Sequence, residues 1–332
     1  MNSIIVNLES NSYRIIIEEN SLDCLYKHID VSRHAFIVSD KNVEKFYLEK
    51  VKSQFISSDH FSIAPGESSK SMMDLQAILS YMQKQKLDRN TLLIALGGGV
   101  VGDIAGLAAS LYLRGIDFIS IPTTTLSQID SSVGGKVAVN LNGVKNVVGT
   151  FYHPKLVIID PNTLETLANS QYNSGIVEAV KMGLLFDNDL FNLILNKDIK
   201  TNINTIIKKS LKCKKAIVEI DEKDLNQRQL LNFGHTLGHA IEAKYKYSHG
   251  QSVILGMIYT VKNKEIKKDL VKIAKKLNLL SKVDLSENLY DLMISDKKVL
   301  KQDITLVQVD EIGKGYLKKQ PISNLWELLN VK

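Results

Sequence analysis

Cysteine and proline are scarce in this chain of 332 residues, which contains two cysteines and five prolines. Cys24 and Cys213 stand far apart and lack the spacing of a metal site, so we expect a reducing, cytoplasmic environment. The few prolines and the 44% of hydrophobic residues exclude a disorder-type composition. At roughly 150 residues per domain, the length predicts two domains.

Targeting and membrane signals are also missing. The first ten residues lack a charged segment followed by an apolar one, so we expect no signal peptide. The most apolar long stretch, 92–113, contains five glycines and Asp103, which argues against a membrane span. The basic stretch 262–276 lacks arginine and aromatic residues, which favours a solvated helix face over a nucleic-acid surface. The net charge of +6 would still help to attract a small anion.

Short apolar runs alternate with helical periodicity in the first half of the chain. Strands are expected at 4–8, 13–17, 34–40, 91–96, 117–122 and 156–161, and helices at 74–85 and 100–114. This alternation predicts an α/β, Rossmann-like dinucleotide-binding domain over residues 1–168, with a mainly parallel sheet covered on both faces.

The pattern of hydrophobic residues changes after about residue 165, from alternating strands and helices to mainly helices. Helices are expected at 175–185, 201–220, 230–243 and in the lysine-rich stretch, with one late strand at 304–309. The second half therefore reads as a mainly α-helical domain, 169–332, which we expect to bind metal and substrate.

Two polar segments of the first half could bind phosphate. Gly97-Gly98-Gly99 joins a buried strand to a helix, where the backbone can approach a phosphate closely, although a purely structural turn is the alternative. The segment 122–140, which includes Asp130 and Lys136, is rich in hydroxyls and is followed by Lys145 and Asn146. It reads as a ligand-binding loop, with a solvated connector as the alternative.

Histidines carry the strongest signal in the second half. His235 and His239 are four residues apart and should share a helix face, with Glu242 three residues further on and His249 soon after. Glu178 and Lys181 should share a face of an earlier helix. Two histidines and one carboxylate form a common catalytic zinc set, so a metal is favoured over structural histidines.

Cationic and amide side chains stand just before these histidines. Arg228 and Asn232 are four residues apart and are expected on the face of the histidine helix, with Lys214 ahead of them. A cationic group beside a metal suggests an anionic substrate, although a surface role is the alternative.

Taken together these motifs resemble the 3-dehydroquinate synthase family, within the sugar-phosphate cyclases. In the first half the resemblance rests on D-K-N-V (40–43), P-G-E-S-S-K (65–70), G-G-G-V-V-G-D-I-A-G (97–106), L-R-G (113–115), I-P-T-T-T-L-S-Q-I-D-S-S-V-G-G-K (121–136) and K-N-V-V-G-T-F-Y-H-P (145–154). In the second half it rests on G-I-V-E-A-V-K-M-G (175–183), D-E (221–222), R-Q-L-L-N-F-G-H-T-L-G-H-A-I-E (228–242), H-G (249–250) and D-K-K (296–298).

The resemblance implies a lyase of the shikimate pathway. Its substrate would be 3-deoxy-D-arabino-heptulosonate 7-phosphate, and its products 3-dehydroquinate and phosphate. Bound NAD would be reduced and reoxidised within each turnover, and a divalent metal, zinc or alternatively cobalt, would bind the substrate hydroxyls. The resemblance also implies a homodimer, with neither nucleic acid nor membrane as a partner.

The resemblance further implies roles for individual residues. The metal would be held by Glu178, His235 and His249. The carboxylate and phosphate of the substrate would be bound by Arg114, Asn146, Lys181, Lys214, Arg228, Asn232 and one of Lys297 and Lys298. The NAD site would be lined by Asp40, Asn42, Glu67, Lys70, Gly98, Gly99, Asp103, Thr123, Thr124, Lys145 and Thr166. His239 and Asp224 would transfer protons, and Asp130 and Lys136 would act where cofactor and substrate meet.

The chain departs from the family pattern at three places. Asp224 stands where the family often has Glu, so its shorter reach puts its role in proton transfer in doubt. Gln251 follows H-G in place of Glu, and T-L-A-N-S-Q (166–171) replaces T-L-P-x-R-E at the cofactor edge.

Three other functions remain open from the sequence. A cyclase acting on sedoheptulose 7-phosphate or glucose 6-phosphate is the first, a metal-dependent polyol dehydrogenase the second, and a non-enzymatic dinucleotide-binding scaffold a distant third. The retained Lys214, Arg228 and Lys145-Asn146 favour a substrate that has both a carboxylate and a phosphate.

Overall fold

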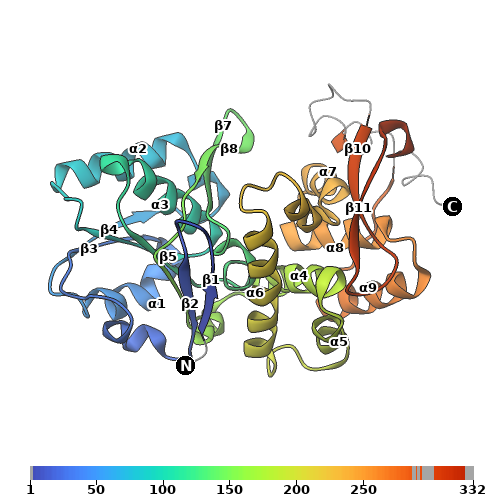
Figure 1. The fold of residues 1–332 in the computed structure, drawn as a ribbon, viewed down its shortest axis with the longest axis horizontal. Coiled ribbons are helices and arrows are strands. Elements are labelled where there is room, and N and C mark those ends of the chain that lie inside the picture. The colour runs from blue at the N-terminus through green and yellow to red at the C-terminus, as the bar shows by residue number, and fades with distance from the viewer. Residues whose placement is uncertain (1–2, 286–288, 290–291, 294–302, 326–332) are drawn as a thin grey trace. The chain divides into compact units, whose positions relative to one another are not determined.

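The structure is a computed structural model that describes residues 3–285, 289, 292–293 and 303–325. Lys297 and Lys298, one of which is expected to contact substrate, lie outside these residues. The chain divides into two compact units, Met1–Ala168 and Asn169–Lys332 (Figure 1). Among the described helices, none has the length and apolar character needed to span a bilayer.

The first unit is built on a seven-stranded sheet. Its strands, in spatial order, are β1 (Ser3–Val6), β2 (Tyr13–Ile17), β9 (Leu156–Ile159), β6 (Phe118–Pro122), β5 (Leu92–Gly97), β3 (Ala35–Asp40) and β4 (Ser58–Ile63). β1 pairs with β2 in antiparallel fashion, and every other neighbouring pair is parallel. The expected mainly parallel sheet is confirmed. β4 was not expected from the sequence, because its residues S-D-H-F-S-I are largely polar.

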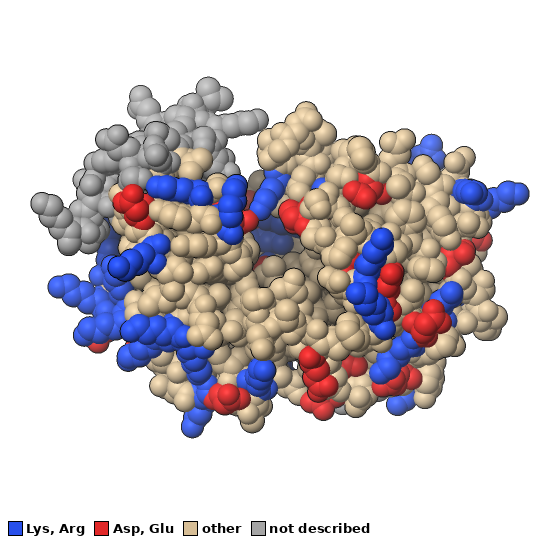
Figure 2. All heavy atoms as spheres, turned by 180° about the vertical axis from the view of Figure 1, so that it is seen from behind, with Lys and Arg blue, Asp and Glu red and all other residues tan. Residues whose placement is uncertain are grey.

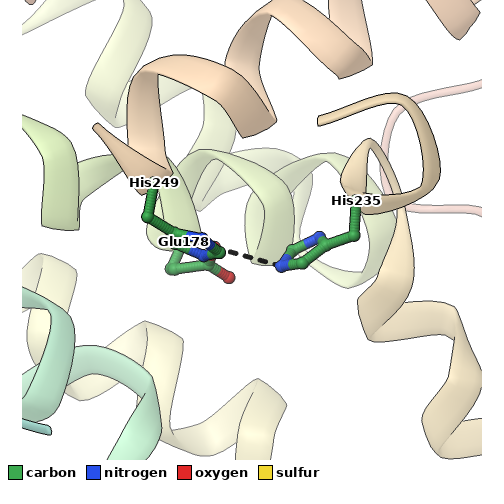
Figure 3. A group of neighbouring side chains, drawn as sticks. All are labelled: Glu178, His235 and His249. Atoms are coloured by element: carbon green, nitrogen blue, oxygen red, sulfur yellow. Dashed lines mark ion pairs between the residues drawn. The ribbon is translucent and has the colours of Figure 1, made fainter. Parts of the chain in front are cut away.

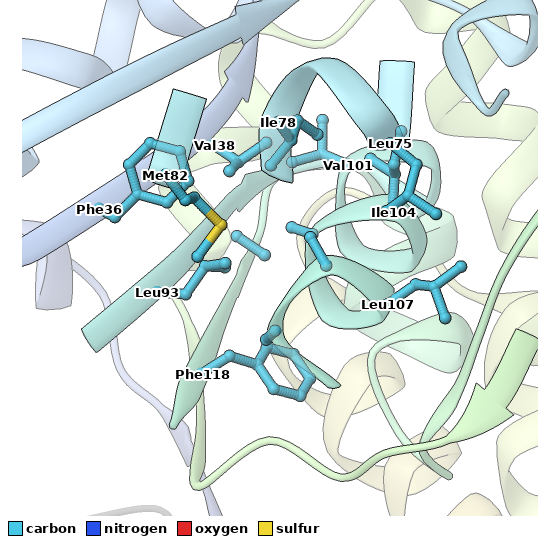
Figure 4. Packing of buried hydrophobic residues seen from close by; sticks show 14 of the residues in the cluster. Phe36, Val38, Leu75, Ile78, Met82, Leu93, Val101, Ile104, Leu107 and Phe118 are labelled. Atoms are coloured by element: carbon cyan, nitrogen blue, oxygen red, sulfur yellow. The ribbon is translucent and has the colours of Figure 1, made fainter. Parts of the chain in front are cut away.

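Helices pack on both faces of this sheet, as expected. Phe36 and Val38 of β3 belong to the core that includes side chains of α2 (Met72–Lys84) and α3 (Gly99–Leu111), which Figure 4 shows. Ile37, the residue between them, belongs to the core on the opposite face, together with Leu48 and Val51 of α1 (Lys41–Lys52). Side chains alternate between the faces because successive residues of a strand point to opposite sides.

The order of the strands creates a switch point between β3 and β5. From β3 the chain proceeds outward to β4, and from β5 it proceeds in the opposite direction to β6 and β9. In parallel α/β sheets, ligands bind at the carboxyl ends of the strands on either side of such a point. Asp40 ends β3 and Gly97 ends β5, so these two ends flank that position.

A hairpin replaces part of the expected polar loop at 122–140, so that prediction was wrong in part. The segment forms the π-helical turn η5 (Ser127–Ser131) and the strand β7 (Lys136–Leu141), which pairs with β8 (Val144–Phe151). Asn142 and Gly143 form the turn, with φ of 50° and 79°. Asn-Gly is the strongest short hairpin signal, and it marks this turn.

The second unit is mainly helical, as expected. Its helices are α4 (Asn169–Phe186), α5 (Asn188–Asn196), α6 (Ile203–Ile220), α7 (His235–Tyr245), α8 (His249–Thr260) and α9 (Lys264–Lys276), and its strands β10 (Asp303–Val309) and β11 (Gly315–Pro321) pair antiparallel. α9 buries Ile266, Leu270 and Ile273 on one face. Lys268 and Lys272 lie on the exposed face, and Figure 2 shows basic side chains with acidic ones among them over this unit.

The histidine helix starts later than the sequence suggested. Residues 230–243 were expected to form one helix, but α7 begins at His235 and is preceded by the 3-10 helix η7 (Gln227–Asn232). Gly234 separates the two, with φ of 75°, a left-handed conformation that L side chains rarely adopt. A Cβ at Gly234 would also lie 2.5 Å from Met257 Cγ, so α8 passes very close at this point.

Glycines let α4, α7 and α8 approach one another closely. A Cβ at Gly250, near the start of α8, would lie 2.0 Å from the Ser174 carbonyl oxygen of α4. A Cβ at Gly256 would lie 2.0 Å from the Gly234 carbonyl oxygen, just before α7. Both contacts are with backbone atoms, which cannot rotate away as a side chain could. These helices therefore keep their spacing only with glycine at both positions.

Gly256→Ala should lower the free energy of unfolding by about 1–3 kcal/mol, the usual cost of forcing extra atoms into a packed core. Gly102→Ala in α3 is the matched control, because a Cβ there meets no atom within 4 Å. That control should be neutral or more stable by about 0.5–1 kcal/mol, since alanine favours a helix. Urea unfolding followed by circular dichroism compares the two. Equal stability of both variants would contradict the packing argument.

Candidate metal and substrate site

Three helices of the second unit bring two imidazoles and a carboxylate together. Glu178 lies in the middle of α4, His235 is the first residue of α7, and His249 is the first residue of α8. Glu178 Oε1 is 3.8 Å from His235 Nε2 and 3.5 Å from His249 Nε2, and Figure 3 shows the side chains converging. Ligands around one tetrahedral zinc ion are about 3.3–3.5 Å apart, given bonds of about 2.0–2.1 Å.

Each imidazole is oriented through its other ring nitrogen. His235 Nδ1 is 3.1 Å from the carbonyl oxygen of Phe233, and His249 Nδ1 is 3.4 Å from Glu242 Oε2. Such acceptors fix the ring and leave Nε2 for a metal, as in many metal sites. Glu242 was noticed in the sequence only for its spacing from His239, and the fold shows that it supports His249. Gln251, at the second departure from the family pattern, donates to Ser281 Oγ over 2.9 Å.

Glu178 is a buried charge that makes an ion pair with a buried cation. Its side chain is 1% exposed, and Oε2 pairs with Lys181 Nζ, one turn along α4. Oε1 has no hydrogen bond of good geometry among the described residues, although both imidazoles face it. A buried carboxylate oxygen without a donor is costly, and a cation placed there would remove that cost. The three residues therefore fit a divalent metal ion.

Burial and charge set the protonation of this group. Burial would raise the pKa of Glu178, but Lys181 and the two imidazoles outweigh it and hold the pKa well below its ordinary value. Burial, reinforced by Lys181, lowers the pKa of His235 to about 3, so this imidazole is neutral and able to bind a metal. Burial would also lower the pKa of His249, but Glu178 and Glu242 raise it to about 9. A metal ion would therefore displace a proton from His249.

His239 lies next to the three-residue set but not in it. Its ring centroid is 5.4 Å from that of His235 and 6.3 Å from that of His249, and its side chain is exposed. The ligand atoms that lie within 4.8 Å of one another come from Glu178, His235 and His249. The spacing of four residues between His235 and His239 could not by itself separate these two positions.

Cationic and polar side chains of the same unit follow a different arrangement from the one expected. Arg228 and Asn232 do not share the face of the histidine helix, because both lie in η7 and α7 begins only at His235. Arg228 is 3% exposed, and its Nη1 donates to the carbonyl oxygen of Glu222 over 2.7 Å. Lys214 of α6 is 6% exposed. Together with Lys181, they make three buried cations among the described residues of this unit.

In the first unit, the glycine turn lies at the carboxyl end of β5. Gly98 is the residue before α3, and no side chain caps that helix. Its backbone N–H groups are therefore suited to an anion. A Cβ at Gly98 would lie 2.9 Å from Thr124 Cγ2, so the turn packs against the residues that follow β6. Thr123 N donates to the carbonyl oxygen of Gly97 over 3.0 Å, which joins the two strand ends.

Lys70 links several residues expected at the cofactor and substrate. Its Nζ contacts Asp103 Oδ2 and Asn146 Oδ1, and Lys70 is 5% exposed. Burial raises the pKa of Asp103 to about 6, against the opposing effect of Lys70. Asn140, which the sequence analysis did not single out, joins the group by donating to Glu67 Oε1 over 2.9 Å and accepting from Asn146 N over 2.8 Å.

The other residues expected in the first unit lie on separate elements. Asp40 caps α1 by accepting from Asn42 N over 2.8 Å. Thr166 Oγ1 is 2.8 Å from the hydroxyl of Tyr47, a contact that the sequence did not reveal. The remaining positions are Arg114 in η4 (Tyr112–Arg114), Asp130 in η5, Lys136 at the start of β7 and Lys145 in β8.

The different positions of His235 and His239 predict different effects of replacing each of them with alanine. His235→Ala should lose bound zinc, because it would remove one of the three proposed protein ligands. His239→Ala should keep its zinc and its fold but lose on the order of 10²–10⁴ in turnover, the usual size of a general acid–base contribution. Elemental analysis beside an activity assay checks both variants. A zinc-free His239 variant beside a zinc-loaded His235 variant would reverse the assignment.

Solved structures with the same fold include two synthases that were determined with NAD+ and a divalent metal ion. The chain superposes on 2-deoxy-scyllo-inosose synthase complexed with carbaglucose-6-phosphate, NAD+ and Co2+ with a TM-score of 0.87, at 22% identity and 99% coverage of both chains. For 2-epi-5-epi-valiolone synthase from Streptomyces hygroscopicus subsp. jinggangensis 5008, with NAD+ and Zn2+ bound, the TM-score is 0.86 at 23% identity and 97% coverage of both. These likenesses confirm the fold class of an α/β domain followed by a mainly helical one.

Sequence comparisons identify the family. Residues 60–174 match the family model for the 3-dehydroquinate synthase N-terminal domain, and residues 175–299 match that for the C-terminal domain. The 3-dehydroquinate synthase of Clostridium beijerinckii is 40% identical over 96% of this chain and 98% of that protein. That of Clostridium perfringens strain 13 is 42% identical over 94% and 96%. The chain therefore belongs to the 3-dehydroquinate synthase family.

Proposed function

We propose that this protein converts 3-deoxy-D-arabino-heptulosonate 7-phosphate to 3-dehydroquinate and phosphate, using a divalent metal and NAD that is reduced only transiently. One observation carries the proposal: the buried Glu178 and the half-buried His235 and His249 lie in the same unit as three buried cations, Lys181, Lys214 and Arg228. The relatives that are about 40% identical over nearly the whole chain bear the name of this activity.

The three-residue set Glu178, His235 and His249 would let the second unit bind the substrate through a metal ion. Glu178, His235 and His249 supply three ligands, which leaves coordination positions for substrate hydroxyls. When bound, the metal acidifies those hydroxyls, and NAD accepts and later returns a hydride. Lys181 pairs with the Glu178 oxygen that does not face the imidazoles, so it keeps that carboxylate charged and in position.

Buried cations favour an anionic substrate over a simple polyol. Lys214 and Arg228 are buried cations, and charge-assisted hydrogen bonds from lysine or arginine to a carboxylate or phosphate are stronger than hydrogen bonds between neutral groups. We assign these two residues, with Lys181 and Asn232, to the carboxylate and phosphate of the substrate. Arg114 and Asn146 of the first unit are assigned to the same groups. A polyol dehydrogenase would need fewer cationic groups.

Proton transfer is assigned to residues around the metal set and in the 122–140 segment. His239 is exposed and lies beside the ligands, where it can exchange protons with water and substrate. Asp224 would be a second proton-transfer group, and its side chain is one methylene shorter than the Glu often found there. Asp130 and Lys136 are assigned to the position where cofactor and substrate meet.

The NAD site is assigned to the carboxyl edge of the sheet. Helix α3 begins at Gly99, and the free N–H groups at its start suit the pyrophosphate. Asp40 ends the adjacent strand β3 and Asn42 lies in the first turn of α1, a position where ribose hydroxyls are bound in related folds. The other residues assigned to this site are Glu67, Lys70, Gly98, Asp103, Thr123, Thr124, Lys145 and Thr166.

The purified enzyme with zinc and NAD should release phosphate from the heptulosonate phosphate without a lasting increase in absorbance at the wavelength of reduced nicotinamide. The reason is that the hydride returns within the same turnover. Phosphate release and absorbance are followed in one cuvette, with sedoheptulose 7-phosphate and glucose 6-phosphate as competing substrates. Stoichiometric reduced cofactor in solution would indicate a dehydrogenase, and preference for a competitor would indicate another cyclase.

Arg228→Ala should raise KM for the sugar phosphate by about 10- to 100-fold, because hydrogen bonds to charged groups contribute about 1.5–3 kcal/mol. The affinity for NAD should stay the same, since Arg228 is assigned to the substrate. Lys272→Ala, which removes an exposed cation from α9, controls for net charge. An equal loss of NAD affinity in the Arg228 variant would show that the assignment of this arginine to the substrate is wrong.

A further inference from the structure

The dipeptide Asp221-Glu222 follows α6, and Asp221 has no role in the site as described so far. Asp221 is 8% exposed, and its carboxylate accepts three backbone N–H groups of the segment that follows it. Oδ1 accepts from Leu225 N over 2.9 Å, and Oδ2 accepts from Asn226 N over 2.7 Å and from Arg228 N over 3.0 Å. One side chain therefore determines the path of residues 222–228.

Both ends of Arg228 are attached to this dipeptide. Its backbone N–H donates to Asp221 Oδ2, and its guanidinium Nη1 donates to the carbonyl oxygen of Glu222. An arginine side chain has many rotamers and would lose its freedom on binding an anion. The bond from Nη1 restricts these rotamers before any anion arrives, and the bond from the backbone N–H fixes the position from which the side chain extends.

The position of Asp221 does not suit a role in stabilising α6. It stands at the C-terminal end of that helix, where the helix dipole disfavours a negative charge and the last carbonyl groups need donors. A carboxylate supplies no donor. Burial would raise the pKa of Asp221, but the bonds from Arg228 N, Leu225 N and Asn226 N lower it below its ordinary value. The carboxylate thus serves the segment after the helix.

Asp224 lies inside the segment that Asp221 holds. Its φ of 58° is in the left-handed region, which costs free energy for a residue with a side chain and is least unfavourable for Asn and Asp. Such strained conformations persist only where surrounding contacts hold them. The three bonds to Asp221 are contacts of this kind, and the Asp224 N–H also donates to the Asp221 carbonyl oxygen over 3.4 Å.

We propose that Asp221 is a positioning residue for the reaction, whose carboxylate holds residues 222–228 so that Arg228 and Asp224 are preorganised for the phosphorylated substrate. The proposal rests on the function proposed above, because Arg228 and Asp224 have their roles only there. Asp221 itself binds neither substrate nor metal. Its removal should therefore act on substrate affinity and turnover while leaving the metal in place.

The test uses the zinc-loaded enzyme with NAD and the variants Asp221→Asn and Asp221→Ala. Asn keeps one acceptor oxygen and replaces the other with a donor that repels the N–H groups, so it perturbs the segment with little change of volume. Asp198→Ala is the matched control. Asp198 also accepts a backbone N–H, from Thr201 over 2.8 Å, but at an exposed turn.

Three quantities are measured for each variant. Hydrogen–deuterium exchange of peptides covering residues 222–228 reports the order of the segment without any substrate. Calorimetry with inorganic phosphate reports the anion site, and elemental analysis reports zinc. Both Asp221 variants should exchange faster in this segment, bind phosphate at least tenfold more weakly, show a KM for the sugar phosphate raised at least tenfold, and keep their zinc. Asp198→Ala should match the wild type in all of these.

Unchanged exchange in residues 222–228, or unchanged phosphate affinity and KM, would overturn the role of Asp221. Loss of zinc in parallel with phosphate affinity would overturn it too, since it would indicate general support of the fold. If Asp221→Ala does not fold, the Asp221→Asn variant alone tests the positioning role of Asp221. A wild-type enzyme that releases no phosphate from the sugar phosphate would refute the proposed function instead, and the exchange result would still show whether Asp221 orders its segment.

Discussion

The close approach of α4, α7 and α8 is the constraint on which the second unit depends. Gly250 places the start of α8 against the backbone of α4, and Gly256 places its middle against the residue before α7. His249 and His235 are the first residues of the helices that meet in this way. Their side chains reach the same carboxylate only because the helix starts are held near Glu178.

That carboxylate explains why the surrounding residues are charged. A fully buried carboxylate must be paired or must neutralise itself. Lys181 pairs with one oxygen, and the two imidazoles face the other. Glu242 and the carbonyl oxygen of Phe233 then orient the imidazoles from behind. Glu242 and the Phe233 carbonyl oxygen thus hold the imidazoles in place, and the imidazoles face Glu178 Oε1. A divalent metal ion would bind between the imidazoles and this oxygen.

The parallel sheet could be predicted from the sequence because its strands are buried on both faces. L-L-I-A-L-G in β5 and A-F-I-V-S-D in β3 are apolar almost throughout, a pattern that few other structures produce. β4 and β8 were not predicted from the sequence. Their residues are polar or mixed, so neither periodicity nor hydrophobicity identifies these segments as strands. Asn142-Gly143 marks the turn of the hairpin, but it lies just beyond the expected loop at 122–140, and no turn was predicted there.

The site was partly visible in the sequence. Spacing indicated a metal near His235, His239 and His249, but periodicity cannot tell which of two histidines four residues apart faces Glu178. That choice depends on where α7 begins, and Gly234 moves its start to His235. The resemblance to the family supplied the ligand set. Supporting contacts such as Glu242 to His249 and Asp221 to the backbone of Arg228 depend on the fold and leave no pattern in the sequence.

We propose that Glu178, His235 and His249 form one three-ligand metal centre. Anomalous diffraction at the zinc edge, from crystals of the zinc-loaded protein, tests it most directly. We expect one strong peak bonded to a Glu178 oxygen and to Nε2 of both histidines at about 2.0–2.2 Å, with His239 not coordinated. A peak bonded to His239, or a strong peak elsewhere with this position empty, would contradict it.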